Sequence, residues 1–168
     1  MFSVKLKQST LGVALLVMVF ISLLPASGAF ANSSEQLLSV ENHSRTELFD
    51  RAALEALPQV TFETTTMWTE GVLQFSGPSL SMVLSQLDIN ERAVIAEAAN
   101  DYRTTILPEL IGDRYPIIAT RINEEPFGVR EKGPLWIVYP YDHSEDFQRE
   151  LIFSSSVWQL EKLHPADE

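Results

Sequence analysis

Residues 129–142 constrain the fold of this chain most, because they fix a bend and then require a buried strand. The Gly133-Pro134 pair sets the turn, since these two residue types restrict where a backbone can bend. The β-branched and aromatic run at residues 135–139 follows, and such side chains favour a pleated, buried surface. Arg130 and Lys132 stand just before the turn. The segment therefore predicts a strand that forms either the wall of a pocket or part of a core.

The first 31 residues have the pattern of a secretory leader. Lys5 and Lys7 give a positive start, residues 11–24 are apolar, and residues 29–31 read Ala-Phe-Ala. Fourteen helical residues extend only about 21 Å, which is short of a hydrocarbon core of roughly 30 Å. A cleaved leader is therefore favoured over a membrane anchor. We expect cleavage after Ala31 and, because the leader is of bacterial type, a periplasmic location.

The charge balance excludes several classes of partner. Without the leader the chain has 137 residues, the size of one domain, and ten cations against 23 acids give a formal charge of −13. Binding to nucleic acid or to anionic lipid depends on clustered Lys and Arg, so neither partner is expected once the leader has been removed. The chain contains no cysteine, which excludes disulfides, thiolate metal sites and cysteine nucleophiles.

Periodicity and turn residues predict two short helices. Polar residues 32–43 are expected to form a flexible arm, so that the folded domain spans residues 44–168. Ser44 and Glu47 match a capping box for a helix over residues 46–57, which Pro58 ends. Residues 76–78 are expected to open a second helix, with Pro78 near its first position and its apolar stripe at Leu80, Val83, Leu84 and Leu87.

The remaining apolar segments are predicted to be strands. They lie at residues 59–66, 72–75, 93–99, 104–107, 117–122 and 135–139, while residues 151–160 alternate weakly and are expected to pair late. Strands and helices do not alternate regularly, which argues against a doubly wound fold. The sequence thus predicts an α+β domain with a mixed, mainly antiparallel sheet and two short helices.

The sequence offers no catalytic or metal-ligating motif. His43, His143 and His164 lie far apart and lack a metal-ligand spacing. Residues 142–146 are acidic but lack the glycine and the ligand period of a calcium loop, so a solvated turn is favoured. No nucleophile-elbow, P-loop or dinucleotide glycine pattern is present. We therefore predict no catalytic residue and no metal site.

What remains is a set of aromatic and polar residues at predicted strand ends and turns. A concave apolar wall with a few convergent polar groups is the usual form of a small-molecule site. The candidate binding residues are Trp68, Asn100, Asp101, Tyr102, Arg121, Arg130, Lys132, Tyr139, Tyr141 and Trp158. The alternative is that Trp136, Tyr139 and Trp158 are core aromatics and that the arginines are surface charges.

The order of several segments resembles the molybdopterin-binding oxidoreductase domain family of the sulfite oxidase type. The matching segments are residues 75–84, 100–103, 118–126, 133–135 and 156–158, so the resemblance covers about residues 60–163. It implies a barrel-like, mainly antiparallel fold. The chain resembles in particular a sub-branch of small exported members, through residues 68–71 (WTEG), 100–102 (NDY), 130–136 (REKGPLW) and 139–142 (YPYD).

The chain departs from that family at three positions that the resemblance assigns to the cofactor. Thr64 stands where the family has a molybdenum-ligating cysteine, and a hydroxyl is too hard and too basic to replace a thiolate. Trp136 and Val157 stand where the family has an arginine and a lysine, and charge-assisted phosphate contacts are lost there. Lys132, at a position where the family often has histidine or another polar residue, compensates in part.

We therefore expect a non-catalytic, exported ligand-binding or accessory module that has lost molybdopterin, the cofactor that the resemblance implies. Its partner would be a small anionic ligand or an envelope protein. Arg121, Arg130 and Lys132 would contact the anion, and the aromatic candidates would line the pocket. The alternative is a true molybdopterin-dependent oxidoreductase whose metal centre uses no cysteine.

Overall fold

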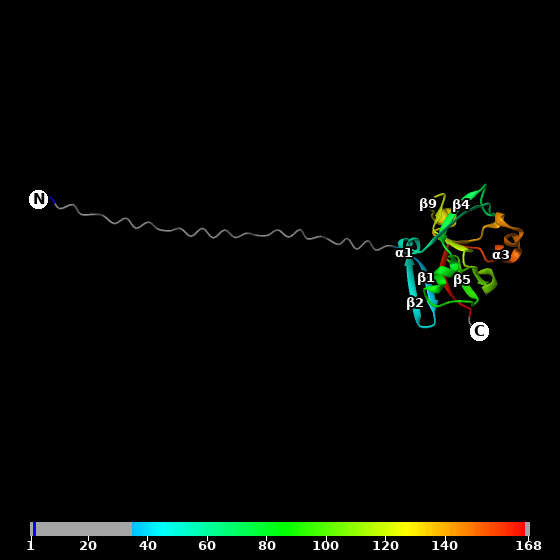
Figure 1. Cartoon of the computed structure of the whole chain (residues 1–168), viewed down its shortest axis with the longest axis horizontal. Coiled ribbons are helices and arrows are strands. Elements are labelled where there is room, and N and C mark those ends of the chain that lie inside the picture. The colour runs from blue at the N-terminus through cyan, green and yellow to red at the C-terminus, as the bar shows by residue number, and fades with distance from the viewer. Residues whose placement is uncertain (1, 3–34, 167–168) are drawn as a thin grey trace. The chain divides into compact units, whose positions relative to one another are not determined.

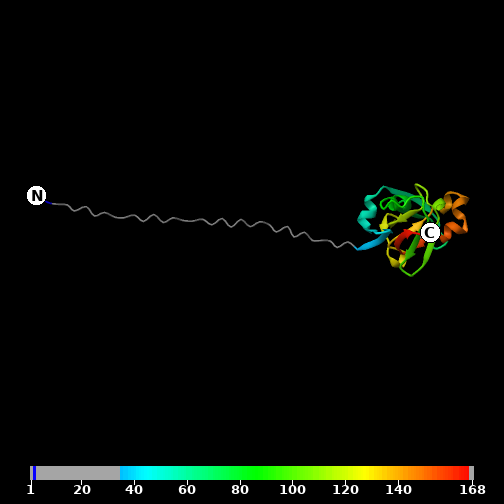
Figure 2. The same ribbon diagram turned by 90° about the horizontal axis from the view of Figure 1, so that it is seen from below.

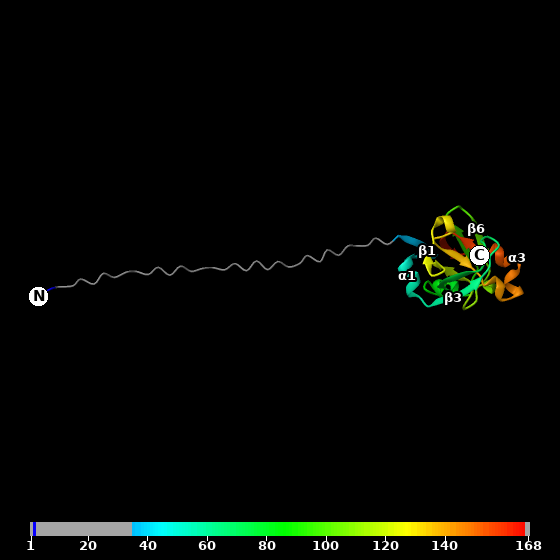
Figure 3. The same cartoon turned by 90° about the horizontal axis from the view of Figure 1, so that it is seen from above.

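The computed structural model describes residue 2 and residues 35–166. The predicted leader and its cleavage point lie outside the described residues. Short strands dominate residues 35–166, and they form three sheets (Figure 1). The helices α1 (Arg51–Ala56) and α3 (Glu150–Ser154) lie at opposite ends of this domain, as Figures 1, 2 and 3 all show.

The largest sheet joins the first and last strands of the sequence. Its five strands are, in order, β2 (Arg45–Asp50), β1 (Gln36–Asn42), β12 (Leu160–Pro165), β5 (Val94–Ala98) and β6 (Arg103–Ile106). β1 and β12 run parallel, and the other three pairs are antiparallel. The sheet is therefore mixed and mainly antiparallel, as predicted.

Two smaller sheets complete the framework. One orders β3 (Gln59–Thr64), β4 (Leu73–Pro78), β8 (Arg121–Ile122) and β9 (Glu125–Pro126), and the other orders β11 (Val157–Trp158), β10 (Trp136–Val138) and β7 (Ile117–Ala119). All the pairs in both sheets are antiparallel. β10 is the central strand of its sheet and all three of its residues are fully buried, so the segment of residues 135–139 is core.

The expected flexible arm is wrong for the described part of residues 32–43. Residues 36–42 form β1, which pairs with β2 and β12. Leu38 and Val40 point into the core and are almost completely buried, while Ser39 between them is only partly buried. This two-residue alternation is the signal of a half-buried strand, and the polar composition of the segment obscured it.

The expected helix over residues 46–57 is wrong in its first half. Residues 45–50 form β2, and the helix α1 begins only at Arg51. Its N-cap is Asp50, whose carboxylate accepts a hydrogen bond from the Ala53 N–H at 2.7 Å, and not the predicted capping box. Pairing along β1 satisfies the backbone of residues 45–50, so tertiary context overrides the local helical pattern.

The helix α2 (Leu80–Ser85) confirms the second predicted helix, although it begins later than expected. Pro78 still belongs to β4, and the N-cap is Ser79, whose hydroxyl accepts a hydrogen bond from the Met82 N–H at 3.2 Å. The predicted apolar stripe is fully buried. α2 therefore covers the core as its period indicated.

Two further predictions need correction. Residues 117–122 form two strands, β7 and β8, because the Thr120 N–H leaves the first strand and donates to the Ser76 carbonyl at 2.9 Å. Residues 151–160 do not form one strand, since α3 occupies the first half and β11 the second. α3 is thus a third short α-helix where two were expected. No helix within residues 35–166 is long and apolar enough to cross a membrane.

Replacing Gly77 with alanine is expected to destabilise the domain. A Cβ at this position of β4 would overlap the backbone carbonyl of Ile118, which cannot move without disturbing β7. Overpacking of this kind typically costs about 1–3 kcal/mol. Urea denaturation should report this loss for Gly77→Ala. Gly112→Ala is the matched control, because its nearest non-neighbouring atom lies at 3.4 Å, and equal stability of the two variants would contradict the packing.

Candidate functional site

The turn before β10 holds the two cations that the sequence singled out. η2, a single 3₁₀ turn (Val129–Glu131), ends at Lys132, which takes the left-handed conformation with φ 69°. The Gly133 N–H donates to the Gly128 carbonyl at 2.7 Å and closes the loop. Only glycine fits at residue 133, because a Cβ there would overlap the backbone of Phe127. The turn is therefore compact and well defined.

A second set of hydrogen bonds ties this turn to the segment between β11 and β12. The Gln159 N–H donates to the Lys132 carbonyl at 3.0 Å, and the Gln159 side-chain amide donates to the Val129 carbonyl at 3.1 Å. These bonds bring Lys132 beside Trp158. The Lys132 Nζ lies 5.2 Å from the centre of the Trp158 ring, a cation–π contact.

All three tryptophans of the chain meet beside this turn. Trp136 of β10 lies directly opposite Trp158 of β11, with ring centres 6.4 Å apart. Trp68, from the loop between β3 and β4, contacts Trp158 at 5.5 Å and Trp136 at 6.0 Å. Trp136 is fully buried, whereas Trp68 and Trp158 are half-buried. Edge-to-face contacts at these distances favour one fixed arrangement of the rings.

Local hydrogen bonds place Trp68. The Thr66 hydroxyl accepts from the Trp68 N–H at 3.1 Å and lies 2.7 Å from the Thr69 hydroxyl. The preceding residue, Thr65, donates to the Asp142 carboxylate from its N–H at 2.5 Å and from its hydroxyl at 2.9 Å. The loop is thus held at its base, close to the ring that it presents.

Trp68, Arg130 and Lys132 line one cavity of about 680 Å³, which we call the Trp68 pocket. This volume is within the ordinary range for small-molecule sites. Its apolar surface includes Leu73, Ile122 and Phe127, and three acids also line it: Glu70, Glu125 and Glu131. A neighbouring cavity of about 550 Å³ lies between α1 and the other side of the η2 turn.

The pocket cations have no carboxylate partner in the part of the chain that the structure describes. Within residues 35–166 neither Arg130 nor Lys132 forms an ion pair. Glu131 is occupied, because its carboxylate accepts the Gly128 N–H at 3.2 Å. In a chain with so many acids, two unpaired cations on one turn are the main electrostatic feature of the pocket.

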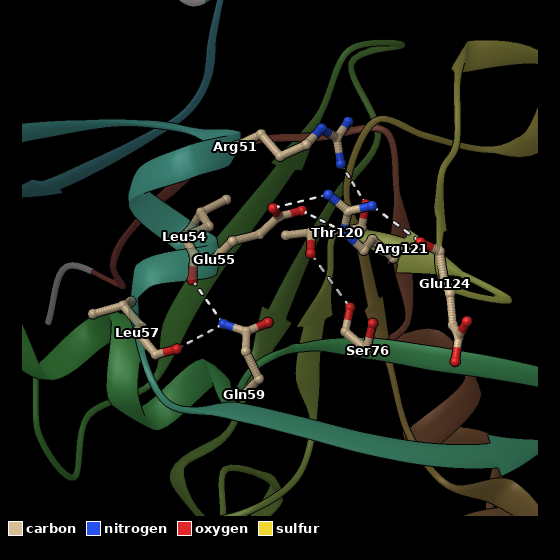
Figure 4. A network of polar contacts seen from close by, with 9 residues as sticks. All are labelled: Arg51, Leu54, Glu55, Leu57, Gln59, Ser76, Thr120, Arg121 and Glu124. Atoms are coloured by element: carbon tan, nitrogen blue, oxygen red, sulfur yellow. Dashed lines mark hydrogen bonds and ion pairs between the residues drawn. The ribbon is translucent and has the colours of Figure 1, made fainter.

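Arg121, the third predicted anion contact, is engaged elsewhere. Figure 4 shows its guanidinium facing the Glu55 carboxylate of α1, with Nε–O and Nη–O distances of 2.8 and 3.0 Å. A third bond runs to the Glu124 carbonyl at 3.0 Å. The bond to Glu55, and then the charges of Glu55 and Glu125, raise the pKa of Arg121. Arg51 donates to the Thr120 carbonyl beside it, so this network fastens α1 to β8.

Asn100, Asp101 and Tyr102 lie in the β5–β6 turn, outside the lining of the Trp68 pocket. The Asn100 side chain accepts from the Tyr102 N–H at 3.2 Å, and Asp101 has φ 63°. The Tyr102 hydroxyl donates to the Ser154 carbonyl at 3.0 Å. These contacts connect the turn to α3.

Tyr139 and Tyr141 are buried behind the tryptophans. The Tyr141 ring contacts Trp68, and its hydroxyl lies 2.6 Å from the Ser156 hydroxyl. Burial raises the pKa of Tyr141 to about 12 and raises that of Tyr139 further. Ser155 is close enough to Tyr139 to influence its pKa, but their geometry is not that of a hydrogen bond. Both phenols stay protonated at neutral pH, so neither can act as a base.

Three of the ten candidates, Trp68, Arg130 and Lys132, therefore line the pocket, and a fourth, Trp158, packs against Trp68 and Lys132 outside the lining. The sequence did not predict the other lining residues, which are apolar at Leu73, Ile122 and Phe127 and acidic at Glu70, Glu125 and Glu131. Residues 122–127 are close in sequence to the two cations, because the two segments flank Gly128. This closeness was the one signal from which their place in the pocket could have been predicted. Nothing in the sequence indicated that the β3–β4 loop would reach the same place.

The Thr64 hydroxyl serves the backbone of two segments. It is almost fully buried, donates to the Thr65 carbonyl at 3.1 Å and accepts from the Asp142 N–H at 3.1 Å. Together with the bonds between Thr65 and Asp142, it joins the end of β3 to η3, the 3₁₀ turn Tyr141–His143. The hydroxyl is thus committed to holding two segments together.

The residues present do not fit molybdopterin as the family resemblance implies it. Thr64 is a hard, committed hydroxyl in the place of a thiolate. Trp136 and Val157 are fully buried apolar residues in the places of two phosphate-binding cations. Trp136 packs on Trp68, Phe75 and Trp158, so the indole fills its space with core contacts. No group of three or more potential metal-ligating side chains occurs among the described residues.

Comparison with known proteins establishes the fold alone. No family model and no curated protein matches the sequence. The structure is similar to the crystal structure of the sulfane dehydrogenase SoxCD from Paracoccus pantotrophus, with a TM-score of 0.58 and 18% sequence identity. The match covers 78% of this chain and 38% of the SoxCD chain, so the chain spans less than half of that protein. The sulfite-oxidase-type fold class expected from the sequence is confirmed.

Replacing Thr64 with valine is expected to lower the free energy of unfolding by about 1–3 kcal/mol, the usual cost of leaving buried polar groups unpaired. The Asp142 N–H and the Thr65 carbonyl would both lose a partner. Urea denaturation measures the change. Thr61→Val, on the exposed face of the same strand, is the matched control and should stay near wild type. If both variants unfold alike, the proposed role of the buried hydroxyl is wrong.

The Asp142 carboxylate should make stability depend on acid pH. Its bonds from the Thr65 N–H and hydroxyl lower the pKa of Asp142 below its ordinary value of 3.8. The stabilisation that these bonds give the folded state is fully present above pH 3.8. It is lost as the pH falls through the lower pKa that Asp142 has in the folded state. Asp142→Asn should therefore be less stable than wild type at neutral pH, and the difference should shrink in acid. Urea midpoints across this range test it, with the exposed Asp146→Asn as control; a difference that is independent of pH would contradict the assignment.

Proposed function

We propose that this protein is an exported, non-catalytic binding module whose Trp68 pocket holds a small anionic ligand or the anionic group of an envelope protein. The proposal adopts the secretory leader read from the sequence and the periplasmic location that it implies. It combines the sulfite-oxidase-type fold with a pocket whose residues differ from those that the family resemblance assigns to molybdopterin.

One observation carries the proposal. Arg130 and Lys132 project from a single rigid turn beside a half-buried tryptophan, and neither has a carboxylate partner among residues 35–166. Unpaired cations next to an apolar wall favour a ligand that has both a negative charge and apolar surface. The hydrogen bonds from Gln159 hold the backbone of the turn in place before any ligand arrives, which lowers the entropic cost of binding.

The chemistry at Thr64, Trp136 and Val157 supports a non-catalytic role. A buried hydroxyl that bridges two backbone groups is not free to bind a metal, and two buried apolar side chains cannot bind phosphate. Tyr139 and Tyr141 keep their protons, so neither phenol supplies a general base beside the tryptophans.

A second candidate is a molybdopterin-dependent oxidoreductase with a metal centre that uses no cysteine. The structural likeness to a sulfane dehydrogenase is the observation that favours it. It requires a ligand to the metal other than Thr64, and no cluster of such ligands occurs within residues 35–166.

Analysis of the protein isolated from the envelope of cells that make molybdopterin separates the two candidates. Elemental analysis should find no stoichiometric molybdenum or tungsten, and native mass spectrometry should find a small anionic adduct or an envelope protein. The double variant Arg130→Gln/Lys132→Gln should lose the bound species, since it lacks both charge-assisted contacts.

Arg92→Gln is the matched control, because Arg92 lines a different cavity and its loss changes the net charge by the same sign. It should retain the adduct. A bound pterin with stoichiometric metal would overturn the proposal in favour of the oxidoreductase. An adduct that persists unchanged in the double variant would remove Arg130 and Lys132 from the site.

A further inference from the structure

The composition of the Trp68 pocket selects a narrower class of ligand than an anion in general. Resting on the proposed function, we infer that the pocket binds an organic anion with a flat apolar body, of the aryl-alkyl carboxylate type. The body would lie against Trp68 and the carboxylate would face the η2 turn. Three features of the pocket carry this inference.

The first feature is the apolar wall. Trp68 is held from behind by its edge-to-face contacts with Trp136 and Trp158, while its half-exposed side lines the pocket. Leu73, Ile122 and Phe127 supply further apolar surface. A ring that cannot rotate away, next to aliphatic side chains, suits a planar apolar group, because aromatic pairs gain energy beyond the area that they bury.

The second feature is the placement of the charged groups in the lining. Two cations, Arg130 and Lys132, and three acids, Glu70, Glu125 and Glu131, line the pocket, and none of the five forms an ion pair within residues 35–166. The Glu131 carboxylate accepts the Gly128 N–H, and Glu125 lies near Arg121. The anionic group of a ligand therefore has its favourable contacts at the two cations of the η2 turn and not elsewhere in the lining.

The third feature is that both cations come from the same short turn. Lys132 is fixed by its left-handed backbone and by its contact with Trp158, and Arg130 lies two residues before it. A carboxylate has two oxygens and can accept from both side chains at once. A carboxylate bound to both cations at the η2 turn would fix the orientation of the ligand.

Three small probes that separate charge from apolar body test the inference. They are 3-phenylpropionate, phenethylamine, which keeps the ring but reverses the charge, and propionate, which keeps the charge but lacks the ring. Because Trp68 lines the pocket and contacts the other two tryptophans of the chain, the intrinsic fluorescence of the full protein reports binding. We expect saturable quenching by 3-phenylpropionate, and binding of the other two probes that is weaker by about tenfold or more.

Variants of the turn locate the contact. Arg130→Gln/Lys132→Gln should weaken binding of 3-phenylpropionate by about tenfold or more, whereas Arg130→Lys, which keeps the charge, should lose much less. Arg92→Gln, on another face, should bind like wild type. An unchanged circular dichroism spectrum confirms that each variant is folded.

Each contrary result overturns a defined part of the inference. Phenethylamine binding as tightly as 3-phenylpropionate overturns the assignment of an anion. Equal binding of propionate overturns the apolar body. No response to 3-phenylpropionate overturns the ligand class as a whole, while the native mass spectrum of the isolated protein still decides separately whether the pocket holds some other anion.

Discussion

The contact among Trp68, Trp136 and Trp158 is the interaction on which the rest of the site depends. Trp136 and Trp158 face each other across β10 and β11, and Trp68 brings the β3–β4 loop onto that pair. Lys132 then lies over Trp158, with its carbonyl bonded to Gln159. The same rings thus form a core, a pocket wall and a support for the cationic turn.

The same packing occupies the positions that a family resemblance assigns to a cofactor. These positions contain residues that stabilise the domain: Thr64 joins two segments, and Trp136 and Val157 are core. The Trp136 Nε1 and the Tyr139 hydroxyl are buried with no hydrogen-bond partner among the described residues. Close aromatic packing therefore prevails over full polar satisfaction in this part of the core.

Local signals were reliable where chain neighbours alone determine structure. The stripe of α2, the strands β3 and β6 and the turn before β10 follow from side-chain period and from Gly and Pro chemistry. They failed where distant segments pair. β1 and β12 pair although they are the first and last strands in the sequence. Residues 45–50 form β2 because they pair with β1. Such long-range pairing has no local sequence signal.

The absence of cysteine, the acidic charge and the turn that carries Arg130 and Lys132 could all be read from the sequence, and the fold class followed from a family resemblance. Which candidates meet became clear only in the folded chain. Folding places Trp68 in one pocket with the two cations and packs Trp158 against Lys132. It pairs Arg121 with Glu55 and leaves Asn100, Asp101 and Tyr102 at another turn. Composition fixes which interactions a chain can make, whereas the pairing of distant strands selects which of them are made.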